Sequence, residues 1–97
     1  MHTDPIDTAA FEAALRRDGY LDIDVKSFAP GGFNAVHAHP FGVRALVLAG
    51  EFTLMAHGAS RRCRPGDTLE LEPGCRHAER YGPAGMTFLV GRRHPAA

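Results

Sequence analysis

The stretch GGFNAVHAHP at residues 31–40 places His37 and His39 on alternate positions of a predicted strand. Alternate strand side chains share a face, so their Cβ atoms lie about 6.6 Å apart at a rise of about 3.3 Å per residue. Metal–imidazole bonds are about 2.0–2.1 Å long, so both rings can meet at one ion, but a firm site needs a further ligand. His77, which follows the turn Pro73-Gly74, is the best candidate for that ligand.

Length and charge exclude several classes of partner. The chain has 97 residues, and its eleven basic and eleven acidic side chains give a net charge of zero. This length predicts one small domain, residues 1–97, and the balanced charge argues against nucleic acid and anionic membranes as partners. No apolar stretch approaches the length that spans a bilayer, and the first residues show no basic and apolar leader, so we expect a cytoplasmic protein.

The two cysteines are expected to be structural. Cys63 and Cys75 are too few and too far apart for a paired-thiol metal motif. In a reducing compartment they should remain free thiols and pack as small, buried or half-buried residues. Cys75 lies two residues before His77, in a turn that is predicted to border the site.

The N-terminal segment, residues 1–19, is predicted to contain one short amphipathic helix. Asp4 and Pro5 form a helix-start signal, and apolar residues then recur at helical spacing as far as Leu15. Gly19 suits the left-handed residue that ends a helix. The small, alanine-rich apolar face favours packing on the outside of a sheet over binding a partner protein.

Residues 20–91 are predicted to form a β-barrel, followed by a frayed tail at 92–97. Leu21, Ile23 and Val25 alternate with polar residues, which is the pattern of a half-buried strand. The later segments are short and separated by closely spaced turns, as in an antiparallel sandwich or barrel. Further strands are predicted at 45–48, 51–56, 68–71 and 86–90, and the predicted turns include Ala49-Gly50 and Gly82-Pro83.

Two stretches together resemble the paired motifs of the cupin superfamily, whose members are small jelly-roll barrels. The first motif, G-x5-H-x-H-x3,4-E-x6-G, is matched by Gly31, His37, His39 and Gly50. The second, G-x5-P-x-G-x2-H-x3-N, is matched by Gly66, Gly74 and His77. The resemblance covers about half of the chain and implies an all-β fold, a small jelly-roll cupin barrel with a short N-terminal α-helix.

The chain departs from these motifs at three positions, one of which is Glu72 in place of the proline of the second motif. In the family, the glutamate of the first motif is usually the fourth protein ligand of the metal. Counting back from Gly50 places Val43 at that position, with Arg44 as the neighbouring alternative. The asparagine that closes the second motif is replaced by Tyr81.

The resemblance therefore implies a metal site made by His37, His39 and His77, with open positions for water or substrate. Imidazole ligands suit one divalent transition metal, and the sequence does not choose among iron, nickel, zinc, copper and manganese. Some cupins with three-histidine sites, such as the thiol dioxygenases and the diketone-cleaving dioxygenases, are iron enzymes. Loss of the glutamate therefore does not by itself abolish chemistry.

Glu79 is the acid expected to face the histidines, because alternation from His77 places Glu79 and Tyr81 on the same face. Glu79 could orient a histidine, act as a base or replace the missing ligand, and Glu79 and Tyr81 are the candidate catalytic residues. Pairing of Glu79 with Arg76 or Arg80 at the barrel mouth is the alternative.

The predicted function is a small metal-binding cupin that is open to a small organic ligand or substrate, with dioxygenase-like chemistry as one form of it. A small-molecule sensor or binding barrel without catalysis is the alternative, and a bare structural barrel is a third class; the sequence leaves open whether the protein is an enzyme. The apolar wall or core is predicted to include Phe33, Phe52, Leu54, Met86 and Phe88. No role is predicted for His2, His57 and His94.

A homodimer is also expected. The segment 45–48 is apolar on both faces, and Leu46 and Leu48 should point away from the histidines. These two side chains need cover from the N-terminal helix or from a second subunit.

Overall fold

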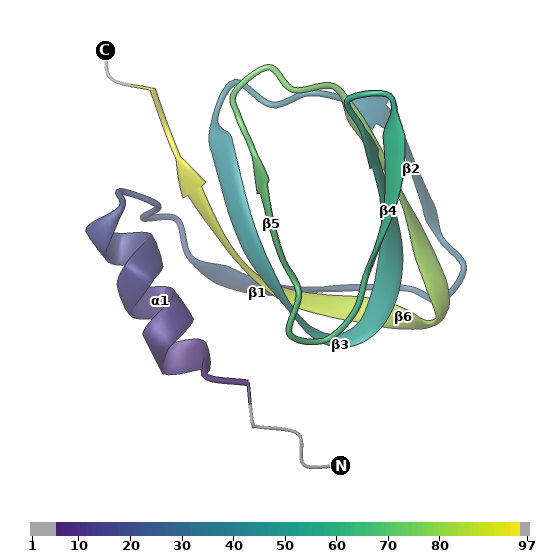
Figure 1. The fold of residues 1–97 in the computed structure, drawn as a ribbon, viewed down its shortest axis with the longest axis horizontal. Helices are drawn as coiled ribbons and strands as arrows, with labels where there is room; N and C mark the ends of the chain where they lie inside the picture. Colours follow the sequence, from purple (N-terminus) through teal and green to yellow (C-terminus); the bar gives the residue numbers. More distant parts are fainter. Residues whose placement is uncertain (1–5, 96–97) are drawn as a thin grey trace.

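Two long antiparallel strands, β3 (Gly42–Ala56) and β6 (His77–Arg93), form the frame of the protein (Figure 1). The computed structural model describes residues 6–95. In that range the other elements are α1 (Thr8–Arg17), β1 (Asp24–Phe28), β2 (Phe33–His37), β4 (Ala59–Cys63) and β5 (Thr68–Leu71). Among these described residues, no helix has the length and apolar character needed to span a membrane.

Each long strand pairs with different neighbours along its length, within one six-stranded sheet. The first part of β3 pairs with β5 and the second part with β4, while β6 pairs with β2 near its start and with β1 near its end. The chain therefore forms the strand orders β1-β6-β3-β5 and β2-β6-β3-β4, which surround a common interior (Figure 1). This is an all-β barrel with one short helix, as the sequence predicted.

The long strands bend where their neighbours change. The register between β3 and β6 shifts on both sides of this point, next to Gly50. Gly50 has φ +70°, and a Cβ added there would overlap the carbonyl oxygen of Gly85. The turns predicted at Ala49-Gly50 and Gly82-Pro83 are therefore wrong, because both lie inside continuous strands and act as bends.

The helix begins later than predicted. Its N-cap is Asp7, whose side chain accepts a hydrogen bond from the Ala10 backbone N–H at 2.9 Å, and the first helical residue is Thr8. The predicted start at Asp4 and Pro5 falls outside the described residues, and the two residues that follow it are not helical.

The end of the helix follows the prediction. Gly19 has φ +84°, and the Tyr20 N–H donates to the Leu15 carbonyl at 2.8 Å, which is the Schellman arrangement. Leu15 is fully buried. Leu46 lies beside the apolar face of α1 and is also buried, so the helix rather than a second subunit provides its cover.

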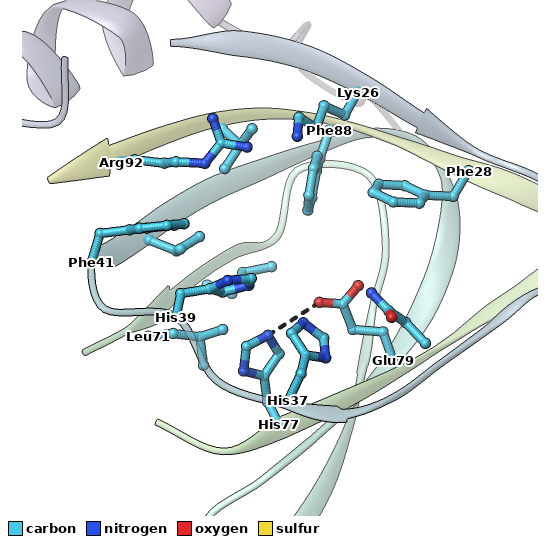
Figure 2. Close-up of a pocket in the computed structure, with 14 residues that line it drawn as sticks. Lys26, Phe28, His37, His39, Phe41, Leu71, His77, Glu79, Phe88 and Arg92 are labelled. Carbon is cyan, nitrogen blue, oxygen red and sulfur yellow. Dashed lines mark ion pairs between the residues drawn. The ribbon is translucent and has the colours of Figure 1, made fainter. Parts of the chain in front are cut away.

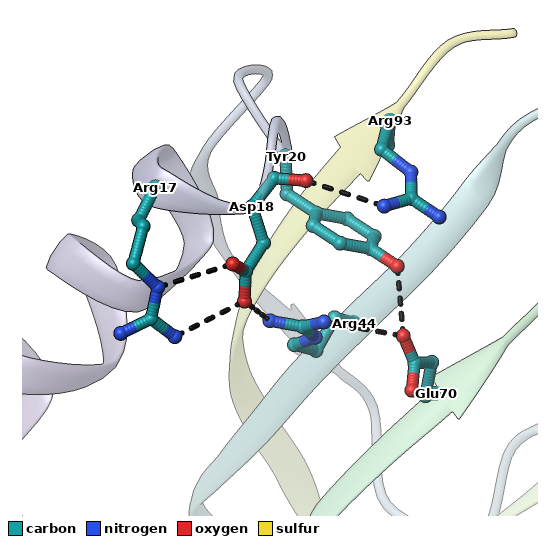
Figure 3. Close-up of polar contacts among 6 residues, drawn as sticks. All are labelled: Arg17, Asp18, Tyr20, Arg44, Glu70 and Arg93. Atoms are coloured by element: carbon teal, nitrogen blue, oxygen red, sulfur yellow. Dashed lines mark hydrogen bonds and ion pairs between the residues drawn. The ribbon is translucent and has the colours of Figure 1, made fainter.

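A polar cluster anchors the end of the helix to the barrel (Figure 3). The buried ring of Tyr20 lies between the guanidinium groups of Arg44 and Arg93, at 4.5 and 4.8 Å from the ring centroid. The Tyr20 hydroxyl donates to Glu70 at 2.8 Å, and Arg44 also donates to Asp18 at 2.6 Å. These contacts join α1 to β3, β5 and β6 through one aromatic residue.

The core lies inside the barrel, and most of the predicted core residues are found there. Phe52, Leu54, Met86 and Phe88 are buried, as predicted. Phe33 is 55% exposed on β2, so its assignment to the core is wrong. Both cysteines are free and buried, as predicted. The other buried core residues include Val43, Ala45, Val47, Leu69, Leu71, Tyr81 and Val90.

Strand β1 presents the opposite face from the one predicted. Its first residue is Asp24, and Val25 is 56% exposed, whereas Lys26 and Phe28 line the interior. The inward face of β1 is partly polar because it borders a cavity. The predicted start of the C-terminal tail at residue 92 is also wrong, because β6 continues to Arg93. Arg92 lines the same cavity.

Candidate metal centre

Three imidazoles converge at one end of a cavity inside the barrel (Figure 2). His37 is the last residue of β2 and pairs directly with His77, the first residue of β6, while His39 lies in the segment that leads to β3. The ring centroids are 4.2 Å apart for His37 and His77, and 4.9 Å apart for His37 and His39. One ligand atom from each ring lies within 4.8 Å of the other two, so the three can share an ion.

Backbone carbonyls fix the orientation of two of these rings. His37 Nδ1 lies 2.7 Å from the Ala35 carbonyl oxygen, and His77 Nδ1 lies 3.0 Å from that of Cys75. A carbonyl only accepts hydrogen bonds, so each Nδ1 carries the proton in the neutral ring and leaves the Nε2 lone pair free. Metal-binding histidines are typically held in this way.

The surroundings of His39 favour its neutral form. Burial lowers the pKa of His39, and the neighbouring His37 and His77 lower it further. Its ring stacks on Phe41, with centroids 4.8 Å apart and planes 14° from parallel. Because a metal binds the unprotonated ring, these contacts favour the ligand form of His39. The residues present therefore fit a divalent ion.

Glu79 completes the polar side of the cavity. Its Oε1 lies 3.5 Å from His77 Nε2, and the Tyr81 hydroxyl donates to its Oε2 at 2.6 Å. Burial raises the pKa of Tyr81, and Glu79 raises it further, so the phenol remains a donor. Pairing with an arginine was the alternative considered for Glu79, but the contacts of its carboxylate are with His77 and Tyr81, and Arg80 instead lies over the Phe33 ring.

Tyr81 supports Glu79 from the neighbouring wall. The Tyr81 ring stacks on Phe28 at a centroid distance of 4.5 Å, and the residue is buried. Its hydroxyl is occupied by the bond to Glu79. Tyr81 therefore orients the carboxylate.

The position of the missing glutamate faces the cavity. Val43 lines the cavity together with the three histidines, whereas Arg44 points to Asp18 and Glu70 on the outside. Of the two positions that the sequence left open, Val43 is the one that lies on the side of the histidines. The wall at this position is apolar.

The cavity holds about 170 Å³, less than the roughly 300–1,000 Å³ of pockets that bind drug-sized ligands. Most of its wall is apolar, and the two cationic side chains on it are Lys26 of β1 and Arg92 of β6 among the described residues. Figure 2 shows both on the side of the cavity opposite the histidines. A ligand that fits this space is small and can carry an anionic group at the end away from the histidines.

Sequence reasoning gave Lys26, Asn34 and Arg92 no role, although all three line the cavity. The period of two in β1 was visible, but Lys26 was assigned to the solvent side. Asn34 pairs with Glu79 across β2 and β6, but a period of two counted back from His37 gives Ala35 and Phe33 instead. Asn34 reaches the cavity because the register between β2 and β6 shifts between Asn34 and His37, which the sequence does not signal.

The remaining histidines lie outside this cluster. His94 pairs with Asp22 at the surface, and the His57 ring contacts Cys75. His2 falls outside the described residues.

Comparison of the whole fold with solved structures finds many cupins. The chain superposes on the DMSP lyase DddQ from Ruegeria pomeroyi DSS-3 with a TM-score of 0.68 and 30% identity, covering 73% of this chain and 36% of the lyase. An RmlC-like cupin from Shewanella frigidimarina gives a TM-score of 0.64 and 23% identity, covering 73% of this chain and 65% of that protein. A cupin superfamily protein from Desulfitobacterium hafniense gives 0.68 and 22%, covering 75% and 66%.

The chain thus spans about two-thirds or less of the length of these structures. No protein-family model and no curated protein matches the sequence. Three observations point to the same fold: the likeness to solved cupin structures, the two long strands that bend next to Gly50, and the histidines at the motif positions that lie together in the cavity. The chain therefore has the fold of the cupins, a small β-barrel built on two long antiparallel strands.

Proposed function

We propose that His37, His39 and His77 hold one divalent transition metal and that a small organic molecule binds beside it. The observation that carries the proposal is the convergence of the three rings, together with the Nδ1 hydrogen bonds to backbone carbonyls that leave Nε2 of His37 and His77 free for a metal. Neutral nitrogen ligands suit iron, nickel, zinc, copper or manganese. When bound, the ion would supply a Lewis acid or a site for dioxygen at its open positions.

The side chains around the histidines favour a small organic acid as the ligand. Lys26 and Arg92 offer cationic groups on the far side of the cavity from the histidines, and the walls between them are apolar. A molecule with a carboxylate would place it near these two groups and its other end near the histidines. The DddQ structure, which shares this fold, is described as a lyase, which supports a small-molecule substrate.

Glu79 is the residue proposed to move a proton. Its Oε1 faces the histidines, and its other oxygen accepts the hydrogen bond from Tyr81, which holds the carboxylate in one orientation. A positioned general base contributes about 10²–10⁴-fold to a rate. The same carboxylate lies close enough to His77 to act as a replacement ligand.

Metal analysis of protein purified without a histidine tag tests the ligand set. His37→Ala, His39→Ala and His77→Ala should each lose one equivalent of metal per chain, because two imidazoles hold an ion poorly. His94→Ala, which changes a histidine outside the cluster, should lose none. Full retention of metal in any of the first three variants removes that residue from the set.

The role of Glu79 and the choice between enzyme and binding protein need a second experiment. The iron-loaded protein is tested for dioxygen consumption with thiols, diketones and phenols, and the same protein is tested for conversion of small organic acids. For a substrate that turns over, Glu79→Gln should lower the rate by about 10²–10⁴-fold and leave metal content unchanged. Loss of metal in this variant makes Glu79 a ligand, and thermal shifts without any turnover support the binding barrel.

We also propose that the protein is a homodimer. Leu21, which precedes β1, is 64% exposed and Val25 in β1 is 56% exposed, and a second copy of the chain packed on this strand would bury both side chains. Sedimentation at about tens of micromolar should show a dimer that Val25→Lys dissociates. A wild-type monomer under these conditions would contradict this proposal and leave the metal site untouched.

A further inference from the structure

A second group of side chains of the types that bind metals comes from two turns, one between β3 and β4 and one between β5 and β6. Figure 1 shows both turns at the same end of the barrel. It consists of His57, Glu72 and Cys75, and one ligand atom from each lies within 4.8 Å of the other two. The family motifs do not include His57 as a ligand, and the group shares no side chain with the three-histidine centre.

Local turn chemistry places each of the three residues. His57 and Gly58 have φ +55° and +73° and connect β3 to β4, as in the two-residue hairpin with both φ values positive. In the other turn the Cys75 N–H donates to the Glu72 carbonyl at 3.1 Å, and Gly74 has φ +79°. Proline followed by glycine at its centre is typical of a type II turn, which brings the two end residues together.

The distances fit a tetrahedral ion. His57 Nε2 lies 3.5 Å from Cys75 Sγ and 3.8 Å from Glu72 Oε1. With Zn–S of about 2.3 Å, Zn–N of about 2.05 Å and Zn–O of about 2.1 Å, tetrahedral angles require about 3.6 Å between S and N and about 3.4 Å between N and O. The sulfur and nitrogen already stand at the required separation, and the nitrogen–oxygen distance is a few tenths of an ångström longer than required. The sulfur–oxygen distance is within 4.8 Å, so the exposed carboxylate has to approach the other two atoms as the ion binds.

The donor set selects a soft divalent ion. A thiolate and an imidazole favour zinc over magnesium or calcium, which prefer oxygen ligands. The thiol gives up its proton to solvent as it binds, and the thiolate and carboxylate together then balance the charge of the ion. Three protein ligands leave the fourth tetrahedral position to water.

We propose that His57, Glu72 and Cys75 form a second metal site, separate from the three-histidine centre, that binds Zn²⁺ or a similar thiophilic divalent ion. The site is reached from solvent, because the His57 and Glu72 side chains are exposed, while the Cys75 sulfur supplies a buried anchor. The two centres are linked through the backbone, because the Cys75 carbonyl accepts the hydrogen bond from His77 Nδ1.

Titration of the metal-free protein with Co²⁺ tests the sulfur ligand. A cobalt–thiolate bond gives a charge-transfer absorption in the near ultraviolet, which histidine and carboxylate ligands do not give. We expect this absorption in the wild type and its loss in Cys75→Ser, which keeps the backbone carbonyl used by His77. Cys63→Ser is the matched control, because Cys63 is a fully buried thiol of the core and its loss should leave the absorption unchanged.

Two further variants separate this site from the first. The double variant His37→Ala, His39→Ala should keep the thiolate absorption, and His57→Asn, which tolerates the positive φ of the turn, should weaken Co²⁺ binding at the sulfur site at least about tenfold. Absence of the absorption in the wild type, its survival in Cys75→Ser, or its loss in the double-histidine variant would each overturn the proposal.

Alkylation of the wild-type thiols by iodoacetamide gives a test that needs no variant. Zn²⁺ should slow modification of Cys75 at least about tenfold, as read by mass spectrometry of the peptide that contains it. An unchanged rate at Zn²⁺ concentrations that saturate the protein would overturn the site even if the serine variant failed to fold.

Discussion

Replacing Val43 with glutamate would restore the acid that the cupin motif lacks, at a position that lines the histidine cavity. Val43 is 9% exposed and pairs with Leu71 on one side and Arg92 on the other. In the metal-free protein the new carboxylate should cost about 1–3 kcal/mol, because a buried polar group loses water without a full set of partners. Arg92 lines the same cavity and offsets part of this cost.

With metal bound, the same substitution should add to the stabilisation that the ion gives. An ion at one hundred times its Kd stabilises the folded protein by about 2.7 kcal/mol. A fourth, anionic ligand that tightens binding tenfold raises this stabilisation to about 4.1 kcal/mol at the same ion concentration. It should also favour a harder ion such as iron or manganese over zinc.

Urea unfolding with and without metal measures both the loss of stability in the metal-free protein and the stabilisation that metal adds. The matched variant Val43→Gln has nearly the same shape as Val43→Glu but no charge, so it shows which effects need the carboxylate. Both variants should lose stability without metal, because both place a polar group in the apolar wall. Val43→Glu alone should bind metal more tightly than the wild type. If the two variants bind metal equally, the carboxylate at Val43 does not reach the ion, and our placement of the ion relative to β3 is wrong.

Three further predictions concern the fold and the free site. Gly50→Ala should lower the free energy of unfolding, measured in urea, by about 3 kcal/mol or more, because the added Cβ would overlap the Gly85 carbonyl. Gly58→Ala has open space around the added Cβ and should lower it by only about 1–2 kcal/mol. Tyr20→Phe should cost about 1 kcal/mol by losing the hydroxyl bond to its carboxylate partner, and no loss would show that the bond contributes nothing. Burial lowers the pKa of His39 in the folded protein, so as the pH falls the unfolded chain takes up a proton at this histidine before the folded chain does. The free energy of unfolding of the metal-free protein should therefore decrease as the pH drops below about 6.5. His39→Gln should show a smaller loss between pH 7.5 and 5, and an equal loss would contradict this reasoning.

The histidine cluster could be predicted because it depends on local rules. A strand period of two places Glu79 on the face of His77, and the structure shows the two side chains 3.5 Å apart. The motif spacing identified His37, His39 and His77 before their pairing was known, and the structure brings the three rings together. The partner of Glu79 was left open, because the sequence does not show which long side chain reaches it.

The faces of β1 and the bends of β3 could not be predicted in the same way. Alternation groups Lys26 with Phe28 and Leu21 with Val25, but it does not say which group meets the interior. The usual rule places apolar residues inside, and it fails here because the cavity accepts a lysine among its lining residues. Similarly, Gly50 signals a change of chain direction, yet only the pairing with β6 shows that the strand continues through it.

The group of His57, Glu72 and Cys75 could not be predicted from the sequence either, because its members lie on turns that are far apart along the chain. Each turn could be predicted from its glycine, but their contact arises only when β3, β4 and β6 are assembled in one barrel. Glycine or asparagine suits the positive φ of His57 better than histidine does, so the imidazole gives the turn no conformational advantage. What it adds is the contact with a thiol and a carboxylate, and that contact is the physical reason to test this turn for metal binding.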